Sequence, residues 1–365
     1  EWPMIIAYDL RYACDHFAGI GKHTHALLEA LLDLPGDDRY RVLWDPRQRN
    51  TRFDLTALRT HPRVEWVERP WHPIRPLGML QTGLWLRATR PDVYLSPFGL
   101  RPLFSGVPEV LTLHDVSALR MAHIPSIVSR VLYRLSLLDA VRARRILTDS
   151  EFSRGEILEL LPVAPERVRT VLLGVPDARE ATPVATRPAR LRAERFALVV
   201  ADNRPRKNLE VLARAWAEDA PAITLAAVGP RDPRFPSLEE WSGGSDRVES
   251  LGWVTPAELA WLYAHAEMVL LPSRYEGFGF PLLEAMTAGV PAIVSDIPVF
   301  HEVGGDAARY VPVDDPAAWR AEVRRLEADP ARRDAMRAAG RARAATFTYR
   351  RTAEATLAVL RDAVG

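Results

Sequence analysis

The chain has 365 residues, with 48 Lys and Arg against 47 Asp and Glu and a formal net charge of +1. This length predicts about two domains, and the balanced charge argues against a nucleic acid as partner, because phosphate neutralisation needs a cationic surplus. The single cysteine, Cys14, excludes an internal disulfide, so we expect a cytoplasmic protein, and no apolar run approaches the ~18 residues of a membrane span.

Short apolar runs alternate with amphipathic segments along most of the chain, which is typical of parallel strands joined by helices. The stretch 1–8 lacks the basic and apolar regions of a signal peptide and is expected to hold the first strand. In the first half we predict strands at 4–8, 40–43, 93–95, 110–113, 146–148 and 168–172. In the second half we predict strands at 197–200, 224–228, 248–251, 268–271, 292–294 and 308–311.

A stretch with three prolines and no apolar periodicity, 175–188, separates the two sets of strands. Such composition is typical of a linker. Two further helices are expected after Pro330, with a break near 346–348. We therefore predict an N-terminal domain at 1–175, a linker at 176–190, a C-terminal domain at 191–346 and a last helical segment at 347–365.

A glycine-containing segment follows the first predicted strand. Gly19, Gly21 and Lys22 are expected to lie in a loop that opens a helix over 24–32. The segment is shorter than a dinucleotide fingerprint, and no acidic residue ends a second strand about 20 positions later, so a nicotinamide site is disfavoured. A loop that brings backbone close to a ligand remains the hypothesis.

His114 and Asp115 follow directly after the apolar strand predicted at 110–113. His114 has two interpretations: it bonds a sugar hydroxyl, or it is a core histidine satisfied by a backbone carbonyl. The residues alone leave both open.

A basic turn follows the first strand of the second half. Arg204, Arg206 and Lys207 precede a predicted helix, where they would form a clamp for a diphosphate. All cationic residues except Lys22 and Lys207 are arginine. The alternative interpretation is an ordinary solvated basic turn.

The most informative segment runs from 272 to 291. Its loop follows the strand predicted at 268–271, and Pro281 suits the first position of a short helix that Gly289 ends. Backbone amides at such a helix start favour phosphate or sugar oxygens. Glu276 in the loop and Glu284, expected in the first turn, are candidates for the donor sugar and a ribose, unless they only cap and complement the helix.

In this order, the motifs resemble the retaining glycosyltransferases of family 4 over some 280 residues. The two glutamates match the family's E-x7-E pattern, and the segments 19–22, 148–153, 205–209 and 248–254 resemble its glycine, serine, lysine and base-side motifs. The resemblance implies an α/β protein of GT-B fold, in which two Rossmann-like, doubly wound domains face each other across a cleft. It also implies that the last helix returns to the N-terminal domain.

The resemblance also implies roles for individual residues. It assigns catalytic roles to His114, Glu276 and Lys207. It assigns donor binding to Gly21, Arg204, Arg206, Lys207, Trp253, Val254, Gly277, Phe278, Gly279, Phe280 and Glu284. It assigns the acceptor side to Gly19, Lys22 and His114. One departure is Asp202, which stands where many members carry an arginine that binds the diphosphate. Arg204 or Arg206 would have to take over the role of that arginine.

Loss of the diphosphate leaves negative charge that cations and helix-terminal amides stabilise. The sequence has no Asp-x-Asp pair, so we expect no metal and no cofactor, with the basic loop in the role of a divalent ion. Retention without a clear nucleophile suggests same-face attack, in which the departing phosphate helps deprotonate the acceptor.

The segment 205–209 is similar to that of bacterial mannosyl- and deoxyhexosyl-transferases that build surface polysaccharides. We therefore expect a GDP-sugar donor and a saccharide or lipid-linked saccharide acceptor. The alternatives are a UDP-sugar donor, a sugar-nucleotide hydrolase or epimerase, and a non-catalytic scaffold that binds nucleotide sugars.

Between Arg39 and Arg145 stand 18 arginines and 8 acidic residues. The stretch also contains Trp66, Trp71 and Trp85. Its segment 126–145 is amphipathic and carries Arg130, Arg134, Arg142, Arg144 and Arg145. This pattern predicts either peripheral binding to the anionic inner face of the plasma membrane or a solvated arginine face.

Overall fold

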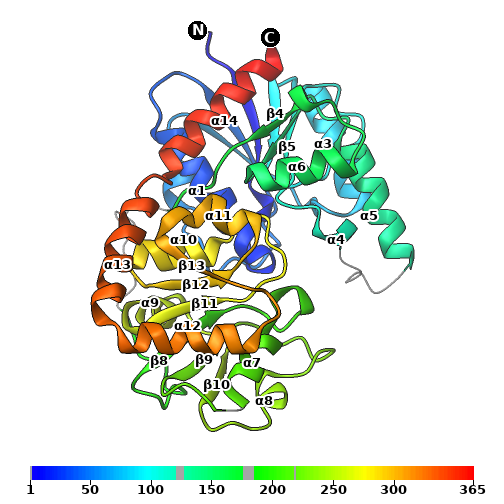
Figure 1. Ribbon diagram of the computed structural model, residues 1–365. Helices are drawn as coiled ribbons and strands as arrows, with labels where there is room; N and C mark the ends of the chain where they lie inside the picture. The colour runs from blue at the N-terminus through cyan, green and yellow to red at the C-terminus, as the bar shows by residue number, and fades with distance from the viewer. Residues whose placement is uncertain (1, 121–126, 176–184, 218) are drawn as a thin grey trace. The chain divides into compact units, whose positions relative to one another are not determined.

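The computed structural model describes residues 2–120, 127–175, 185–217 and 219–365 (Figure 1). The chain forms two compact units. Unit 1 comprises Glu1–Gly174 and Thr348–Gly365, and unit 2 comprises Val175–Phe347. Of the linker predicted at 176–190, residues 176–184 lie outside the described part, and residues 185–190 belong to unit 2.

Unit 1 contains a seven-stranded sheet, and all its paired strands run parallel. In spatial order the strands are β3 (Val64–Glu68), β2 (Arg39–Trp44), β1 (Ile5–Asp9), β4 (Val93–Ser96), β5 (Glu109–Thr112), β6 (Arg145–Thr148) and β7 (Val168–Thr170). Ile6 stands opposite Tyr40 on one side and Val93 on the other. The central strands are buried and read as continuous apolar runs, as parallel strands covered on both faces do.

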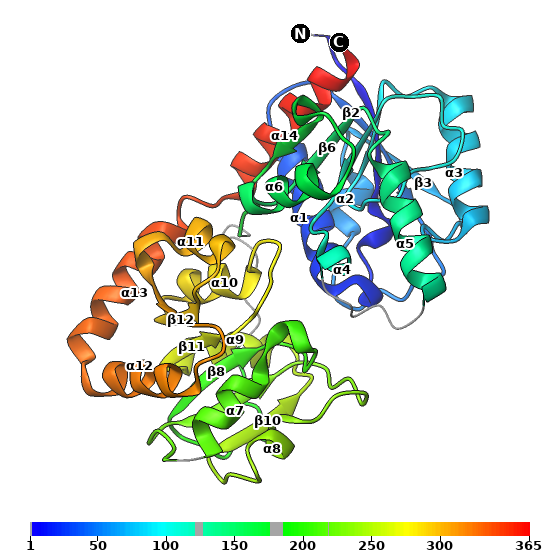
Figure 2. The ribbon, with the colours of Figure 1, turned by 45° about the vertical axis from the view of Figure 1, so that its right-hand side comes forward.

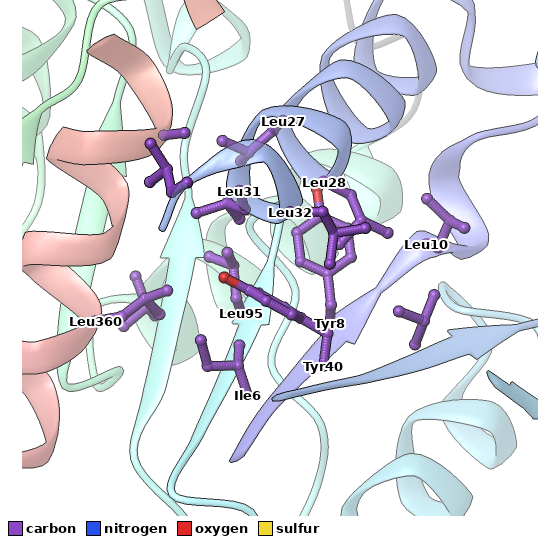
Figure 3. Packing of buried hydrophobic residues seen from close by; sticks show 14 of the residues in the cluster. Ile6, Tyr8, Leu10, Leu27, Leu28, Leu31, Leu32, Tyr40, Leu95 and Leu360 are labelled. Atoms are coloured by element: carbon purple, nitrogen blue, oxygen red, sulfur yellow. The ribbon is translucent and has the colours of Figure 1, made fainter. Parts of the chain in front are cut away.

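The helices of unit 1 include one from the far end of the chain. They are α1 (Ala18–Asp33), α2 (Thr56–Thr60), α3 (Pro76–Thr89), α4 (Ser117–Arg120), α5 (Ile127–Ala140), α6 (Glu151–Leu160) and α14 (Tyr349–Val364). Helix α14 packs beside α1 (Figure 2). Figure 3 shows Leu360 of α14 facing a core that contains Ile6 and Leu31, both fully buried. Burying such side chains, at ~1.5–3 kcal/mol each, holds the C-terminus in unit 1.

Unit 2 contains a parallel sheet of six strands. In spatial order they are β10 (Val248–Gly252), β9 (Thr224–Val228), β8 (Phe196–Val200), β11 (Met268–Leu271), β12 (Ala292–Ser295) and β13 (Ala308–Val311). Its helices are α7 (Leu209–Ala217), α8 (Leu238–Trp241), α9 (Pro256–His265), α10 (Phe280–Ala288), α11 (Pro298–Gly304), α12 (Pro316–Ala328) and α13 (Pro330–Ala344). Trp216 and Trp319 are fully buried, and each indole N–H donates to a backbone carbonyl.

Both sheets are doubly wound, as the sequence predicts, because each strand order reverses once. The reversal lies between β1 and β4 in unit 1 and between β8 and β11 in unit 2. In such sheets ligands bind beyond the carboxyl ends of the strands at the reversal. Two candidate sites therefore follow from topology, one in each unit.

The expected loop with Gly19, Gly21 and Lys22 is wrong, since α1 begins at Ala18 and contains all three residues. Two short 3₁₀ turns, Leu10–Tyr12 and Asp15–Phe17, form the connection from β1 instead. Gly21 is buried, and a Cβ there would lie 2.9 Å from the Tyr12 carbonyl oxygen. Glycine at position 21 therefore permits close packing of α1 against Tyr12 and does not serve the flexibility of a loop.

No helix within the described stretches is long and apolar enough to cross a membrane.

Candidate functional site

A charged cluster lies at the strand reversal of unit 2, where the loops after β8 and β11 meet. Lys207 Nζ lies 2.5 Å from Glu276 Oε1, and each of the two side chains is 11% exposed. The Ser273 hydroxyl donates to the same carboxylate oxygen at 2.7 Å. Arg206 Nη1 lies 3.7 Å from the other oxygen, Glu276 Oε2. We call Arg206, Lys207, Ser273 and Glu276 the charged cluster.

Backbone contacts fix the two loops to each other. The Arg274 N–H donates to the Arg206 carbonyl at 2.8 Å, and its guanidinium donates to the Pro205 carbonyl at 3.1 Å. Asn208 ends the 3₁₀ turn in the left-handed region with φ of 52° and donates its side-chain amide to the Val313 carbonyl. These contacts hold Lys207 in a fixed turn, which preorganises its ammonium group.

The charged cluster keeps Glu276 ionised. Burial alone would raise the pKa of this carboxyl, but Lys207 and Arg206 outweigh burial and, with hydrogen bonds from Lys207 and Ser273, lower the pKa below its ordinary value. One carboxylate thus faces two cations. The two cations exceed the charge of Glu276, and Asp202, 3.9 Å from Arg206, offsets part of the remainder.

Helix α10 begins beside this cluster. Gly279 is its N-cap in the left-handed region with φ of 96°, and a Cβ there would lie 2.8 Å from the Phe300 ring. Phe278 is buried and contacts the rings of Phe280 and Phe347, which anchors the glycine segment. In the first turn of α10, Pro281 has no N–H, and the Leu282 and Leu283 N–H groups donate to the Gly279 carbonyl. Backbone donors to phosphate or sugar oxygens would therefore come from the glycine segment at and before the helix start.

Glu284 lies in the second turn of α10, because the helix starts at Phe280 rather than Pro281. The sequence placed it in the first turn. The hydroxyl of Tyr263, on α9, donates to Glu284 Oε2 at 3.0 Å. Burial and then the neighbouring carboxylate raise the pKa of Tyr263 well above its ordinary value, so its proton stays in place. The sequence did not identify Tyr263 as a site residue, because no motif near it indicates a contact with α10.

The structure distinguishes Arg204 from Arg206, the two candidates to replace the arginine that is absent at position 202. Arg204 is 48% exposed and lies 3.7 Å from Asp232, whereas Arg206 joins the charged cluster. Asp202 accepts from the Arg204 N–H at 3.1 Å and lies 3.9 Å from the Arg206 guanidinium. Its negative charge is therefore partly compensated by its own neighbours.

Trp253 and Val254 follow β10, the outermost strand and two strands away from β8. The Trp253 side chain is 55% exposed, whereas Val254 is buried. Arg190 donates to the Trp253 carbonyl at 2.7 Å. The two residues lie at the carboxyl edge of the same sheet as the charged cluster.

In unit 1, His114 is held at both ring nitrogens. Its Nδ1 lies 2.7 Å from Asp149 Oδ2, just beyond β6, and its Nε2 lies 2.9 Å from the Pro97 carbonyl oxygen, just beyond β4. A protonated ring can donate to both partners at once. Burial lowers the pKa of His114, but Asp149 outweighs burial and raises it.

This geometry matches the second interpretation of His114, in which a backbone carbonyl satisfies the ring. Asp149 was missed, although it follows a predicted strand in the same way as His114. Ser150 caps α6 and accepts from the Ser153 N–H, and the Ser153 hydroxyl donates to the His114 carbonyl at 3.3 Å. His23 lies edge-on to His114 with ring centroids 5.5 Å apart. Burial and then His114 lower the pKa of His23 to about 3, so His23 is neutral.

Aromatic rings gather at the strand reversal of unit 1, a feature that the sequence did not reveal. Tyr12 and Phe98 lie 5.2 Å apart between centroids, and Phe17 contacts both rings. Phe17 and Phe98 are half-buried. Gly19, Gly21 and Lys22 follow within α1. An aromatic surface of this kind suits the apolar face of a sugar ring.

Among the residues that the structure describes, no three His, Cys, Asp or Glu side chains are grouped so as to hold a metal ion.

Comparisons with known proteins support the same architecture. A family model for glycosyl transferases group 1 matches residues 187–343, and a model for Glycosyltransferase Family 4 matches residues 17–179. The chain is 31% identical over 310 residues to O-antigen chain mannosyltransferase B of Escherichia coli, a match that covers 81% of this chain and 79% of that protein.

Two further similarities extend this comparison. O-antigen chain mannosyltransferase RfbU of Salmonella typhimurium is 30% identical over 227 residues, covering 61% of this chain and 62% of that protein. The structure of Anabaena Alr3699/HepE in complex with UDP and glucose superposes with a TM-score of 0.71 at 17% identity, covering 98% of this chain and 100% of that one.

Proposed function

The chain belongs to glycosyltransferase family 4, and we propose that it moves mannose or a related deoxyhexose from a GDP-linked donor to a glycan or lipid-linked saccharide. The acceptor would belong to polysaccharide biosynthesis. The observation that carries the proposal is the charged cluster beside the start of α10, at the strand reversal of unit 2. The similarity to two O-antigen mannosyltransferases supports the choice of sugar.

For the donor, we propose that Lys207 and Arg206 bind the diphosphate together with the amides of Gly277, Phe278, Gly279 and Phe280. Arg204 lies at the rim of this basic turn. Glu284, oriented by Tyr263, would accept from the ribose hydroxyls. Glu276 would accept from hydroxyls of the transferred sugar, and Trp253 and Val254 would lie beside the base.

Bond cleavage at the anomeric carbon places negative charge on the leaving diphosphate. Lys207, Arg206 and the positive end of α10 are fixed before reaction, so they stabilise this charge without reorganisation. We propose that they supply the charge that a metal ion supplies elsewhere. We further propose retention by same-face attack, with the leaving phosphate taking the acceptor proton.

For the acceptor, we propose unit 1. Gly19 and Lys22 near the start of α1, with the half-buried rings of Phe17 and Phe98, offer backbone, charge and stacking surface to a saccharide. His114 would act as a positioned donor rather than as a base, because Asp149 and the Pro97 carbonyl already engage both ring nitrogens. Gly21 serves packing in the structure, so its contribution to the donor would be indirect.

Membrane association is the remaining part of the proposal. Helix α5 exposes Val131, Leu132, Leu135 and Leu138, each at least 45% exposed, with Arg134 among them. This apolar and basic face suits an anionic membrane surface. Ser126 and the side chain of Arg130 lie outside the described part. The helix ends at Ala140, so Arg142, Arg144 and Arg145 of the amphipathic segment lie beyond it.

Trp66, Trp71 and Trp85 do not extend this face. Each is half-buried, and Trp66 and Trp85 pack against the two cores of unit 1. Pelleting with phosphatidylglycerol vesicles should be strong at low salt and weaken as salt rises, because screening reduces the attraction. Absence of pelleting at low salt would contradict membrane association while leaving the transferase proposal intact.

The test of the donor is calorimetric titration of GDP and of UDP in the presence of chelator. GDP should bind the wild type, and Glu284→Ala should weaken binding by about tenfold or more, since a hydrogen bond to a charged group contributes ~1.5–3 kcal/mol. Tyr263→Phe keeps the carboxylate and should weaken binding less. Transfer from GDP-mannose to an O-antigen-type saccharide would then establish the reaction.

The outcomes separate the alternatives. UDP binding without GDP binding would replace the donor with a UDP-sugar, the nucleotide bound in the Anabaena structure. Binding with release of free sugar and no acceptor would indicate a hydrolase. Binding with no turnover at all would indicate a scaffold, and binding of neither nucleotide would refute the proposal.

A further inference from the structure

A cavity of about 420 Å³ in unit 1 is lined mainly by guanidinium groups. Its charged lining consists of Arg101, Glu109, Arg142, Arg144, Arg145 and Arg167. We propose that this arginine pocket is a second anion site, which binds phosphate groups. The inference does not depend on the donor or the acceptor proposed above.

The arginine pocket lies at the opposite edge of the sheet from His114 and Asp149. Glu109 is the first residue of β5, and Arg145 is the first residue of β6. His114 and Asp149 follow the carboxyl ends of the same two strands. Four residues at ~3.3 Å each separate the edges by roughly 13 Å, so the pocket is a separate feature.

Two of the five arginines are compensated by carboxylates. Arg101 pairs with Glu109 and lies 3.0 Å from Asp139, and Arg145 lies 2.7 Å from Asp362. The Ser105 hydroxyl also donates to Glu109. Glu109 is 2% exposed, so its carboxylate is neutralised within the wall of the pocket.

The other three arginines form no such ion pair, although the charge of Arg144 contributes to lowering the pKa of Asp362. Within the described part of the chain, no carboxylate lies within 4.0 Å of Arg142, Arg144 or Arg167. Arg167 donates to the Ala143 carbonyl. This hydrogen bond orients the guanidinium group but does not neutralise its positive charge. Arg142 and Arg144 are exposed at the turn between α5 and β6. Five guanidinium groups thus face three carboxylates, and the surplus positive charge is concentrated around one cavity.

The residue type favours phosphate as the ligand. The planar guanidinium presents paired N–H donors that match two phosphate oxygens, and it is more weakly hydrated than an ammonium. A cavity of this size lies within the range of small-molecule sites, and it exceeds what one phosphate needs. A diphosphate, or the phosphodiester and glycerol of an anionic lipid headgroup, fits this chemistry.

The experiment compares two double variants with the wild type. Arg142→Glu/Arg144→Glu reverses the two uncompensated exposed charges of the pocket. Arg39→Glu/Arg52→Glu is the matched control. Both residues are exposed in unit 1 and lie outside the pocket, and the double substitution changes the net charge by the same amount as the pocket variant. Equal thermal unfolding midpoints of the two variants establish that both are folded.

Calorimetric titration with pyrophosphate is the first arm. Binding at the charged cluster of unit 2 is common to all three proteins, so the pocket is seen as the difference between the variants. We expect the pocket variant to lose the corresponding binding event, with affinity at least about tenfold lower, equivalent to ~1.4 kcal/mol, while the control retains it. Equal binding by the two variants would overturn the proposal.

Pelleting with phosphatidylglycerol vesicles, against phosphatidylcholine vesicles as the neutral reference, is the second arm. Loss of both pyrophosphate binding and pelleting in the pocket variant alone assigns the site to a lipid headgroup. Loss of pyrophosphate binding with unchanged pelleting assigns it to a soluble phosphate ligand. An equal loss in both double variants would show that net charge alone is responsible, which would also overturn the proposal.

Discussion

Replacing Lys207 with methionine tests whether the charged cluster depends on its buried ion pair. Methionine retains most of the side-chain volume but removes the ammonium, so Glu276 keeps only the Ser273 hydroxyl and Arg206 at 3.7 Å. Removing one partner of a buried pair costs ~3–5 kcal/mol. Because Arg206 still compensates part of the charge, we expect the free energy of unfolding to fall by about 2–4 kcal/mol at pH 7.

A double-mutant cycle with Glu276→Gln isolates the interaction. Lys207→Met/Glu276→Gln leaves no stranded charge, so it should be more stable than the sum of the single effects by about 1–3 kcal/mol. Urea unfolding followed by tryptophan fluorescence measures all four proteins. Arg214→Met is the control, because Arg214 and Glu210 form an ion pair on the surface of α7; its effect should stay below ~0.5 kcal/mol.

The pH dependence gives an independent test. The pKa of Glu276 is lowered in the folded wild type, so the pair stabilises fully above the ordinary glutamate pKa and less as pH falls through the lowered value. In Lys207→Met, only Arg206 and the Ser273 hydrogen bond oppose burial, so the pKa of Glu276 rises. The stability difference between the two proteins should therefore be largest at pH 7 and smallest below about pH 4. A constant difference, together with additive single variants, would refute the reasoning.

Two further predictions concern unit 1. Asp149→Asn should lower the pKa of His114, since the carboxylate is what outweighs burial there; a histidine NMR titration measures this. Gly21→Ala should destabilise the protein by about 1–3 kcal/mol, because its Cβ would lie 2.9 Å from the Tyr12 carbonyl oxygen. Gly19→Ala, in the same helix with nothing within 4 Å, should be neutral or stabilise by up to ~1 kcal/mol, and thermal unfolding compares the two.

Each of these two predictions would be contradicted by a specific result. An unchanged His114 titration in Asp149→Asn would mean that Asp149 does not hold the imidazolium. Equal effects of the two alanine substitutions would contradict a helix that begins at Ala18, because residues of a solvent-exposed loop would not differ in this way.

Strands were the most predictable elements, because a parallel strand buried on both faces is a short continuous apolar run. All twelve predicted strands correspond to strands of the described structure, with ends shifted by at most two residues. The structure also contains β3 (Val64–Glu68), a strand that the sequence did not predict. It is an edge strand whose apolar residues are interrupted by the exposed Glu65 and Glu68, so its sequence has no continuous apolar run to detect.

Contacts between distant loops were not predictable from local pattern. Lys207 and Glu276 are 69 residues apart, and His114 and Asp149 are 35 apart. Each residue was recognisable as polar and just beyond a strand, but which loops adjoin depends on the strand order. The reversal between β8 and β11 brings the first pair together, and the neighbouring positions of β5 and β6 bring the second pair together.

The arginine surplus between Arg39 and Arg145 shows why a charge count does not define a surface. Arg41 and Arg59 pair with Glu65 and Glu68 of β3, so their charges are locally compensated. The strand and turn geometry directs other arginines to the opposite edge of the sheet from the predicted ligand site. In three dimensions the arginines of this stretch separate into ion-paired residues, exposed residues such as Arg39 and Arg52, and those that line the arginine pocket. Binding should therefore respond to which arginine is changed, and not to how many.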